Sequence, residues 1–140
     1  MTREKPVLRV LMVEDDVDAA RLFARRLAWS ATADFRVSQA PDLQSALACI
    51  EHDEFDALLL DLSLPDAPAT STLAAAGAIS RHLPIVVLTG TDDDDLAVLA
   101  ARLGVQDYLV KDAQDSRSLS RAILAAVHRH PWVRAAALSA

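Results

Sequence analysis

The sequence is poor in several residue types and patterns, and each shortage excludes a class of protein. Its one cysteine, Cys49, cannot pair within the chain, which excludes a disulfide scaffold and fits a reducing cytosol. No apolar run approaches the length of a membrane span, and the first residues lack the apolar segment of a signal peptide. Lysine occurs only at Lys5 and Lys111, and the net charge of −6 disfavours direct binding of nucleic acid. We therefore expect a soluble cytoplasmic protein that contacts neither membrane nor nucleic acid.

The length and composition indicate one domain with a substantial core. A chain of 140 residues, 52% of them hydrophobic, can remove about two-thirds of its unfolded surface from water. We expect a single domain over residues 1–140, with its core at about 7–128 and a tail at 131–140. Pro131 can stop one helix or start another. Trp132 is expected to pack against its own domain or a partner, and the tail is too short to be an output domain.

Hydrophobic periodicity predicts alternating strands and helices along the whole chain. The expected strands are residues 7–13, 35–40, 57–60, 85–88 and 107–110. The expected helices are residues 17–29, 42–50, 72–82, 95–103 and 119–130. This alternation is typical of an α/β protein with a parallel sheet that helices cover on both faces.

The apolar runs also predict the order of the strands. The first, third and fourth strands are nearly continuous apolar runs, as strands buried on both faces are. Residues 35–38 instead alternate between apolar and polar, as in an edge strand. The pattern therefore favours a flavodoxin-like, doubly wound, five-stranded sheet in the order 2-1-3-4-5.

Acidic residues follow the two strands where this sheet would bind a ligand. In such a sheet the crevice lies beyond the carboxyl ends of strands 1 and 3, where the winding direction changes. Glu14 and Asp15 follow strand 1, and Asp61 follows strand 3. Three converging carboxylates repel one another, and without a cation at least one would be driven toward its protonated form. Oxygen ligands of this kind suit Mg²⁺, which keeps waters that a phosphate group can replace.

Thr89 and Lys111 follow the fourth and fifth strands and suit the other half of a phosphoryl site. A phosphoryl group in transfer spreads negative charge over its oxygens, so a hydroxyl donor and a compact cation stabilise it beside a metal. Asp61, central in the acidic cluster, is the natural nucleophile, since carboxylates form aspartyl-phosphate intermediates.

Each of these residues also has an ordinary structural explanation. The acids after strand 1 could simply favour a helix N-terminus, and Asp61 or Thr89 could be a cap. A lone lysine is usually solvated. The combination of acid pair, acid, threonine and lysine at successive strand ends is what favours a site.

Four segments resemble the receiver domain of two-component response regulators. They are VLMVEDD, LLLDLSLPD, IVVLTG and VQDYLVK, and the resemblance covers about residues 7–128. It implies that Asp61 is the phosphoacceptor, that Thr89 moves toward the phosphoryl group and that Lys111 pairs with it. The implied magnesium ligands are Asp15 and Asp61 directly, Glu14 through water, and the backbone carbonyl of Ser63. Tyr108 resembles the switch aromatic that turns inward when the threonine moves; the alternative is a plain strand residue with its hydroxyl in water.

The sequence departs from the family's pattern in three places. Ala69 stands where receivers usually have glycine, after an extra proline at Pro68, so the loop after Asp61 is expected to be stiffer or differently routed. Asp112 replaces the usual cis proline, and a trans bond after Lys111 is therefore expected. The acidic run 92–95 is expected to be a solvated helix start, or else a negative rim that slows acidic phosphodonors or selects a basic partner surface.

The resemblance implies a signalling domain that catalyses only its own phosphorylation and dephosphorylation. Its expected partners are a sensor histidine kinase or histidine phosphotransfer protein, and a downstream protein at the face of helix 4, strand 5 and helix 5. A dimer that forms on phosphorylation is also expected. Two alternatives stay open: an interaction module that works without phosphorylation, and a receiver fragment of a larger regulator or hybrid kinase. A haloacid-dehalogenase-type hydrolase is disfavoured, because it needs a second aspartate where Ser63 stands.

Overall fold

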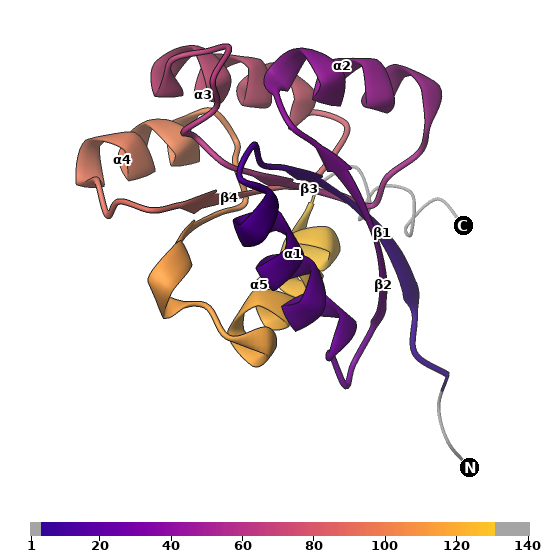
Figure 1. Cartoon of the computed structure of the whole chain (residues 1–140). Helices are drawn as coiled ribbons and strands as arrows, with labels where there is room; N and C mark the ends of the chain where they lie inside the picture. Colours follow the sequence, from indigo (N-terminus) through magenta and orange to yellow (C-terminus); the bar gives the residue numbers. More distant parts are fainter. Residues whose placement is uncertain (1–3, 131–140) are drawn as a thin grey trace.

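A five-stranded parallel sheet forms the middle of the protein in the computed structural model, which describes residues 4–130 (Figure 1). The strands are β1 (Val7–Val13), β2 (Asp34–Ala40), β3 (Ala57–Leu60), β4 (Ile85–Thr89) and β5 (Asp107–Val110). Their order across the sheet is β2-β1-β3-β4-β5. This order and the predicted α/β fold class are thus confirmed.

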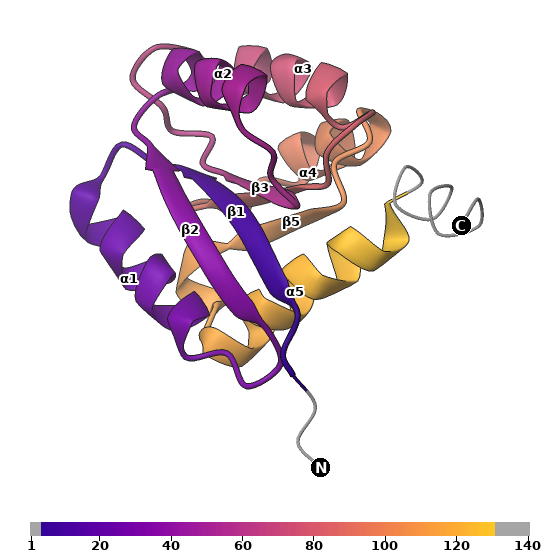
Figure 2. The ribbon, with the colours of Figure 1, turned by 90° about the vertical axis from the view of Figure 1, so that its right-hand side faces the viewer.

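Helices cover both faces of this sheet. They are α1 (Val17–Ala28), α2 (Leu43–His52), α3 (Ala69–Ile79), α4 (Asp94–Arg102) and α5 (Ser116–Arg129), with a 3₁₀ turn η1 at Lys111–Ala113. Figures 1 and 2 show α1 and α5 on one face and α2, α3 and α4 on the other. None of the helices within residues 4–130 is both long and apolar enough to cross a membrane.

The core is divided by the sheet into two layers. Alternate residues of β1 enter opposite layers: Val10 and Met12 pack with α1 and α5, whereas Leu11 and Val13 pack with the other three helices. β3 and β4 are buried along their whole length, which explains their continuous apolar sequence. β2 alternates and β5 is half-buried, as expected of the two edges.

Two helices, α3 and α5, begin three residues before their predicted starts because of the residues at their N-caps, whereas the other three begin within one residue of prediction. Helix α3 begins at Ala69 rather than at residue 72, since Pro68 takes the N-cap position in an extended conformation and the helix follows it directly. Helix α5 begins at Ser116 rather than at residue 119. There Asp115 and Ser118 form a capping box, in which each side chain bonds the backbone of the other. Both helices therefore start three residues earlier than their apolar pattern suggests.

The far end of α5 is fixed to the end of α3. His130, which is buried, forms a hydrogen bond through Nε2 with the Ser80 carbonyl. Residues 131–140, including Pro131 and Trp132, lie outside the described part, so the packing expected of Trp132 stays a prediction.

Candidate functional site

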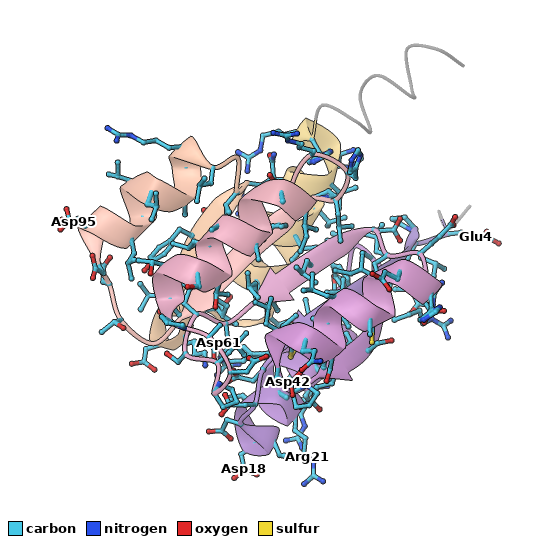
Figure 3. The ribbon with its side chains drawn as sticks, turned by 90° about the horizontal axis from the view of Figure 1, so that it is seen from above. Glu4, Asp18, Arg21, Asp42, Asp61 and Asp95 are labelled. Carbon is cyan, nitrogen blue, oxygen red and sulfur yellow. The ribbon has the colours of Figure 1, made fainter. Side chains whose placement is uncertain are left out.

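The carboxyl ends of β1 and β3 bring three acidic side chains together. The two strands pair directly, and the Asp61 amide donates to the Val13 carbonyl at 3.0 Å. One carboxylate oxygen from each of Glu14, Asp15 and Asp61 lies within 4.8 Å of the others. Glu14 and Asp61 are buried and Asp15 is exposed. Figure 3 shows Asp61 toward the same edge of the molecule as Asp18 and Asp42, near the starts of α1 and α2.

Asp16, the acid that follows Glu14 and Asp15, caps the N-terminus of α1. The Asp16 carboxylate accepts hydrogen bonds from the Asp18 and Ala19 amides at the start of α1. The explanation that these acids favour a helix start is therefore right for Asp16, whereas Glu14 and Asp15 join the acidic cluster.

Lys111 reaches this cluster from the end of β5. Its ammonium donates to Glu14 Oε1 at 2.7 Å and lies 3.5 Å from Asp61 Oδ2. Burial lowers the pKa of Lys111, but the two carboxylates outweigh that effect and the pKa is raised. Lys111 is consequently charged at neutral pH and partly compensates the acids.

Burial is the largest cause of the shift in the pKa of Glu14. Burial, together with the hydrogen bond and charge of Asp61, raises the pKa of Glu14 from 4.5 to about 7, although Lys111 opposes the shift. The floor beneath the carboxylates is apolar: a cavity of about 10 Å³ is lined by Met12, Phe23, Leu59 and Leu88 as well as by the charged groups. Glu14 Oε2 is buried without a hydrogen-bond partner among the described residues. Glu14 is thus the carboxylate that the crowded cluster drives toward its protonated form.

Thr89 and Tyr108 lie on the next two strands of the sheet. Thr89 is buried at the end of β4, where its hydroxyl accepts from the Thr91 amide at 3.3 Å. Tyr108 is half-buried on β5, and its hydroxyl oxygen has no access to solvent and no hydrogen bond of ordinary geometry within residues 4–130. Burial raises the pKa of Tyr108, whereas the neighbouring Thr89 side chain lowers it. The alternative that this hydroxyl stands in water is wrong for this structure: it lies inside, near Thr89.

The loop after Asp61 is tied to helix α2. The Ser63 amide donates to Asp61 Oδ1 at 3.1 Å, so this part of the loop lies beside the acidic cluster. Further along, the two Asp66 carboxylate oxygens accept from the Leu43 and Gln44 amides, each at 3.1 Å. The sequence gives no sign of this clamp, because an aspartate after a proline reads as an ordinary turn residue.

The other two places where the sequence departs from the receiver pattern, at Asp112 and in the acidic run 92–95, have the structure expected of them. The peptide bonds among the described residues, including that between Lys111 and Asp112, are all trans. In the acidic run, Asp93 caps α4 by accepting from the Asp95 and Leu96 amides, which confirms a helix start.

Comparison with known proteins agrees with this arrangement. The sheet is doubly wound, and acids and a lysine meet where its winding direction changes. These features define an α/β protein with a charged site at the carboxyl edge of the sheet. The family described as "Response regulator receiver domain" matches residues 10–123. The chain therefore belongs to the receiver domain family of two-component response regulators.

Curated relatives are longer than this chain. It is 34% identical over 103 residues to the transcriptional regulatory protein PrrA of Mycobacterium tuberculosis, covering 74% of this chain and 43% of PrrA. It is 32% identical over 124 residues to the transcriptional regulatory protein CpxR of Escherichia coli K12, covering 89% of this chain and 51% of CpxR. The chain thus spans about half the length of these relatives or less.

Solved structures share the fold over almost the whole domain. A CheY-like receiver domain protein from Methanospirillum hungatei superposes with a TM-score of 0.76 at 24% identity, covering 89% of this chain and 96% of that one. The Mn²⁺-bound form of response regulator Rcp1 gives a TM-score of 0.66 at 25% identity, covering 84% of this chain and 90% of that one.

Proposed function

We propose that this receiver domain is a phosphorylation switch in which Asp61 accepts a phosphoryl group from a phosphohistidine. The donor would be a sensor histidine kinase or a histidine phosphotransfer protein. The convergence of Asp61, Glu14, Asp15 and Lys111 carries this proposal, because a module used only for docking needs no such charged cluster. This distinguishes the switch from the alternative of a phosphorylation-independent interaction module.

The chemistry required of the chain is modest. A carboxylate oxygen of Asp61 attacks the phosphorus, the bond between phosphorus and the donor imidazole nitrogen breaks, and that nitrogen keeps the electron pair and takes up a proton. Lys111, 3.5 Å from Asp61 Oδ2, is close enough to turn from Glu14 to a phosphoryl oxygen. Thr89 would offer its hydroxyl to another. Hydrolysis of the acyl phosphate would return the domain to its first state, so the domain catalyses only its own modification.

The acidic residues fit a magnesium ion. Three carboxylates share a small volume, and buried Glu14 Oε2 lacks a partner in the described part of the chain. Asp15 and Asp61 would be direct ligands, the Ser63 carbonyl would complete the protein ligands, and Glu14 would act through water. When bound, the ion would neutralise charge on the phosphoryl oxygens. The Mn²⁺-bound form of the related Rcp1 supports a divalent cation here.

The signal would leave the domain through the face of α4, β5 and α5. Tyr108 and Thr89 link that face to the site, and a groove of about 240 Å³ between α4 and β5 is lined by Ala97, Ala101 and Tyr108 among others. A downstream protein, or a second copy in a dimer formed on phosphorylation, would bind there. The cytoplasm as its location, and a place within a larger regulator or hybrid kinase, belong to the same proposal.

A small phosphodonor tests the assignment of Asp61. We expect acetyl phosphate with Mg²⁺ to add about 80 Da to the chain, the mass of one phosphoryl group. Asp61→Asn should abolish this gain, and Asp53→Asn, which changes an exposed aspartate at the end of α2, should leave it unchanged. Full modification of Asp61→Asn would refute the acceptor, and an unmodified wild-type chain would favour the phosphorylation-independent module.

A further inference from the structure

A groove of about 590 Å³ lies between the end of α1 and the start of α5, away from the acidic cluster. The chain enters β2 beside it, so it lies at the amino ends of the strands, whereas Asp61 lies at the carboxyl ends. Figure 2 shows the end of α1 and the start of α5 close together at this edge. The residues that matter for its chemistry are Trp29, Ser30, Thr32, Arg117, Ser120 and Arg121.

Hydrogen bonds of serine hydroxyl groups connect the segments that line the groove. Ser30 and Ser120 are buried, and their Oγ atoms lie 2.7 Å apart, within hydrogen-bond distance. Ser30 Oγ also accepts from the Thr32 and Ala33 amides at 3.2 and 3.3 Å. These contacts join the loop after α1 to α5, so the groove is formed before anything binds to it.

The rim combines an exposed indole with free guanidinium groups. Trp29 is 73% exposed, the highest exposure among the large hydrophobic residues of the described chain. Arg117 and Arg121 are exposed and four residues apart on α5, so they lie on the same side of that helix. Neither forms an ion pair within residues 4–130. Tryptophan and arginine are the residue types that contribute most often to binding energy at protein interfaces.

Positive charge collects here although the chain is acidic. Lys5 adds to it by donating to the Ser30 carbonyl at 3.1 Å. Two carboxylates at the starts of β2 and α5 already have partners: that of Asp34 pairs with Arg36, and that of Asp115 accepts from the Ser118 amide. The groove therefore has a positive, partly apolar surface on a chain whose net charge is −6.

We propose that this groove binds an acidic peptide segment of a partner protein. Carboxylates of the segment pair with Arg117 and Arg121, and an apolar side chain of the segment covers Trp29. A nucleic acid fits less well, because it needs a run of cations and the rest of this chain would repel its backbone. The site is separate from Asp61, so a partner can stay bound here while the phosphoryl group is transferred at the other edge.

Peptide selection tests the proposal even though the partner protein is unidentified. A library of random 12-residue peptides displayed on phage would be selected on the wild-type chain. We expect the selected peptides to be rich in Asp and Glu and to carry an aromatic or aliphatic residue. A synthetic peptide of the selected sequence would then be titrated by fluorescence polarisation. Replacing its acidic residues by Gln and Asn should abolish binding, and raising the salt concentration should weaken it.

Variants of the chain locate the binding. Arg117→Ala/Arg121→Ala should raise the Kd for the selected peptide at least tenfold, and Trp29→Ala should raise it several-fold. Arg117→Gln/Arg121→Gln should repeat the loss while keeping a polar side chain on each residue and a similar helical propensity. The matched control Arg81→Ala/Arg102→Ala removes the same charge elsewhere and should change the affinity less than twofold. Three outcomes would each overturn the proposal. The selected peptides could lack an acidic bias, or the arginine variants could bind the peptide as well as wild type does. A 12-nucleotide single-stranded DNA could also displace the labelled peptide at a lower concentration than the unlabelled peptide does.

Discussion

A proton on Glu14 should compete with Mg²⁺ for the acidic cluster. Burial raises the pKa of this carboxyl group to about 7. Carboxylate groups bind Mg²⁺ in their ionised form, and a proton on Glu14 removes negative charge that attracts the cation, so binding of Mg²⁺ favours loss of the proton. With this pKa, Glu14 is mostly protonated at pH 6 and mostly ionised at pH 8. We therefore expect the Kd for Mg²⁺ to be about tenfold higher at pH 6 than at pH 8.

The same group makes the stability of the metal-free protein depend on pH. The pKa of Glu14 is higher in the folded chain, at about 7, than its ordinary value of 4.5. Between these two values the folded state binds more protons than the unfolded state, so the free energy of unfolding falls as the pH rises. The contribution is fully present below the unfolded pKa and is lost as the pH rises through the folded pKa. Its upper limit is about 3–4 kcal/mol, since one pKa unit corresponds to roughly 1.4 kcal/mol and the pKa rises from 4.5 to about 7.

Titration calorimetry and thermal unfolding measure the two effects. Mg²⁺ would be titrated at both pH values into chelator-treated wild type, Glu14→Gln and Glu51→Gln, the last of which changes an exposed glutamate of α2. Wild type and Glu51→Gln should show the tenfold change, and Glu14→Gln less than a twofold change. The melting temperature of metal-free wild type should fall from pH 5 to pH 8, and that of Glu14→Gln much less. Equal affinities of wild type at both pH values, or an undiminished change in Glu14→Gln, would refute the reasoning.

Two further predictions concern the metal and the output face. Millimolar Mg²⁺ should raise the melting temperature of wild type, and Asp15→Asn should reduce this response while relieving repulsion in the metal-free protein; an unchanged response would show that the cation binds elsewhere. Phosphorylation of Asp61 should alter hydrogen exchange in residues 95–110 more than in residues 42–50, and Thr89→Ala should accept the phosphoryl group but lose most of that change. Normal transmission by Thr89→Ala, or a change mainly in residues 42–50, would rule out the route through Tyr108.

The order of the sheet could be predicted from the sequence because the pattern of apolar residues in each strand reflects how deeply the strand is buried. Continuous apolar runs placed β1, β3 and β4 inside, and alternation placed β2 at an edge, which was enough to choose the observed order. The starts of α3 and α5 were missed because capping decides them, and the apolar pattern begins a turn later than the cap.

The site was predicted by position but not in all its contacts. The ends of parallel strands meet at one edge, so Glu14, Asp15, Asp61 and Lys111 could be expected together. That Lys111 pairs more closely with Glu14 than with Asp61 depends on side-chain conformations that no periodicity encodes. The expected role of the Ser63 carbonyl stays a prediction.

The clamp made by Asp66 gives the domain a built-in reporter. Its carboxylate joins the loop that follows the proposed phosphoacceptor to the first amides of a helix more than twenty positions earlier in the chain. The amide resonances of Leu43 and Gln44 therefore record where that loop stands, although neither residue belongs to the site. A chimaera that exchanges this loop with that of another receiver must keep the aspartate, or supply another acceptor, to leave the start of α2 intact. The loop and the start of α2 are thus coupled through Asp66, so a substitution in one of them is expected to affect the structure of the other.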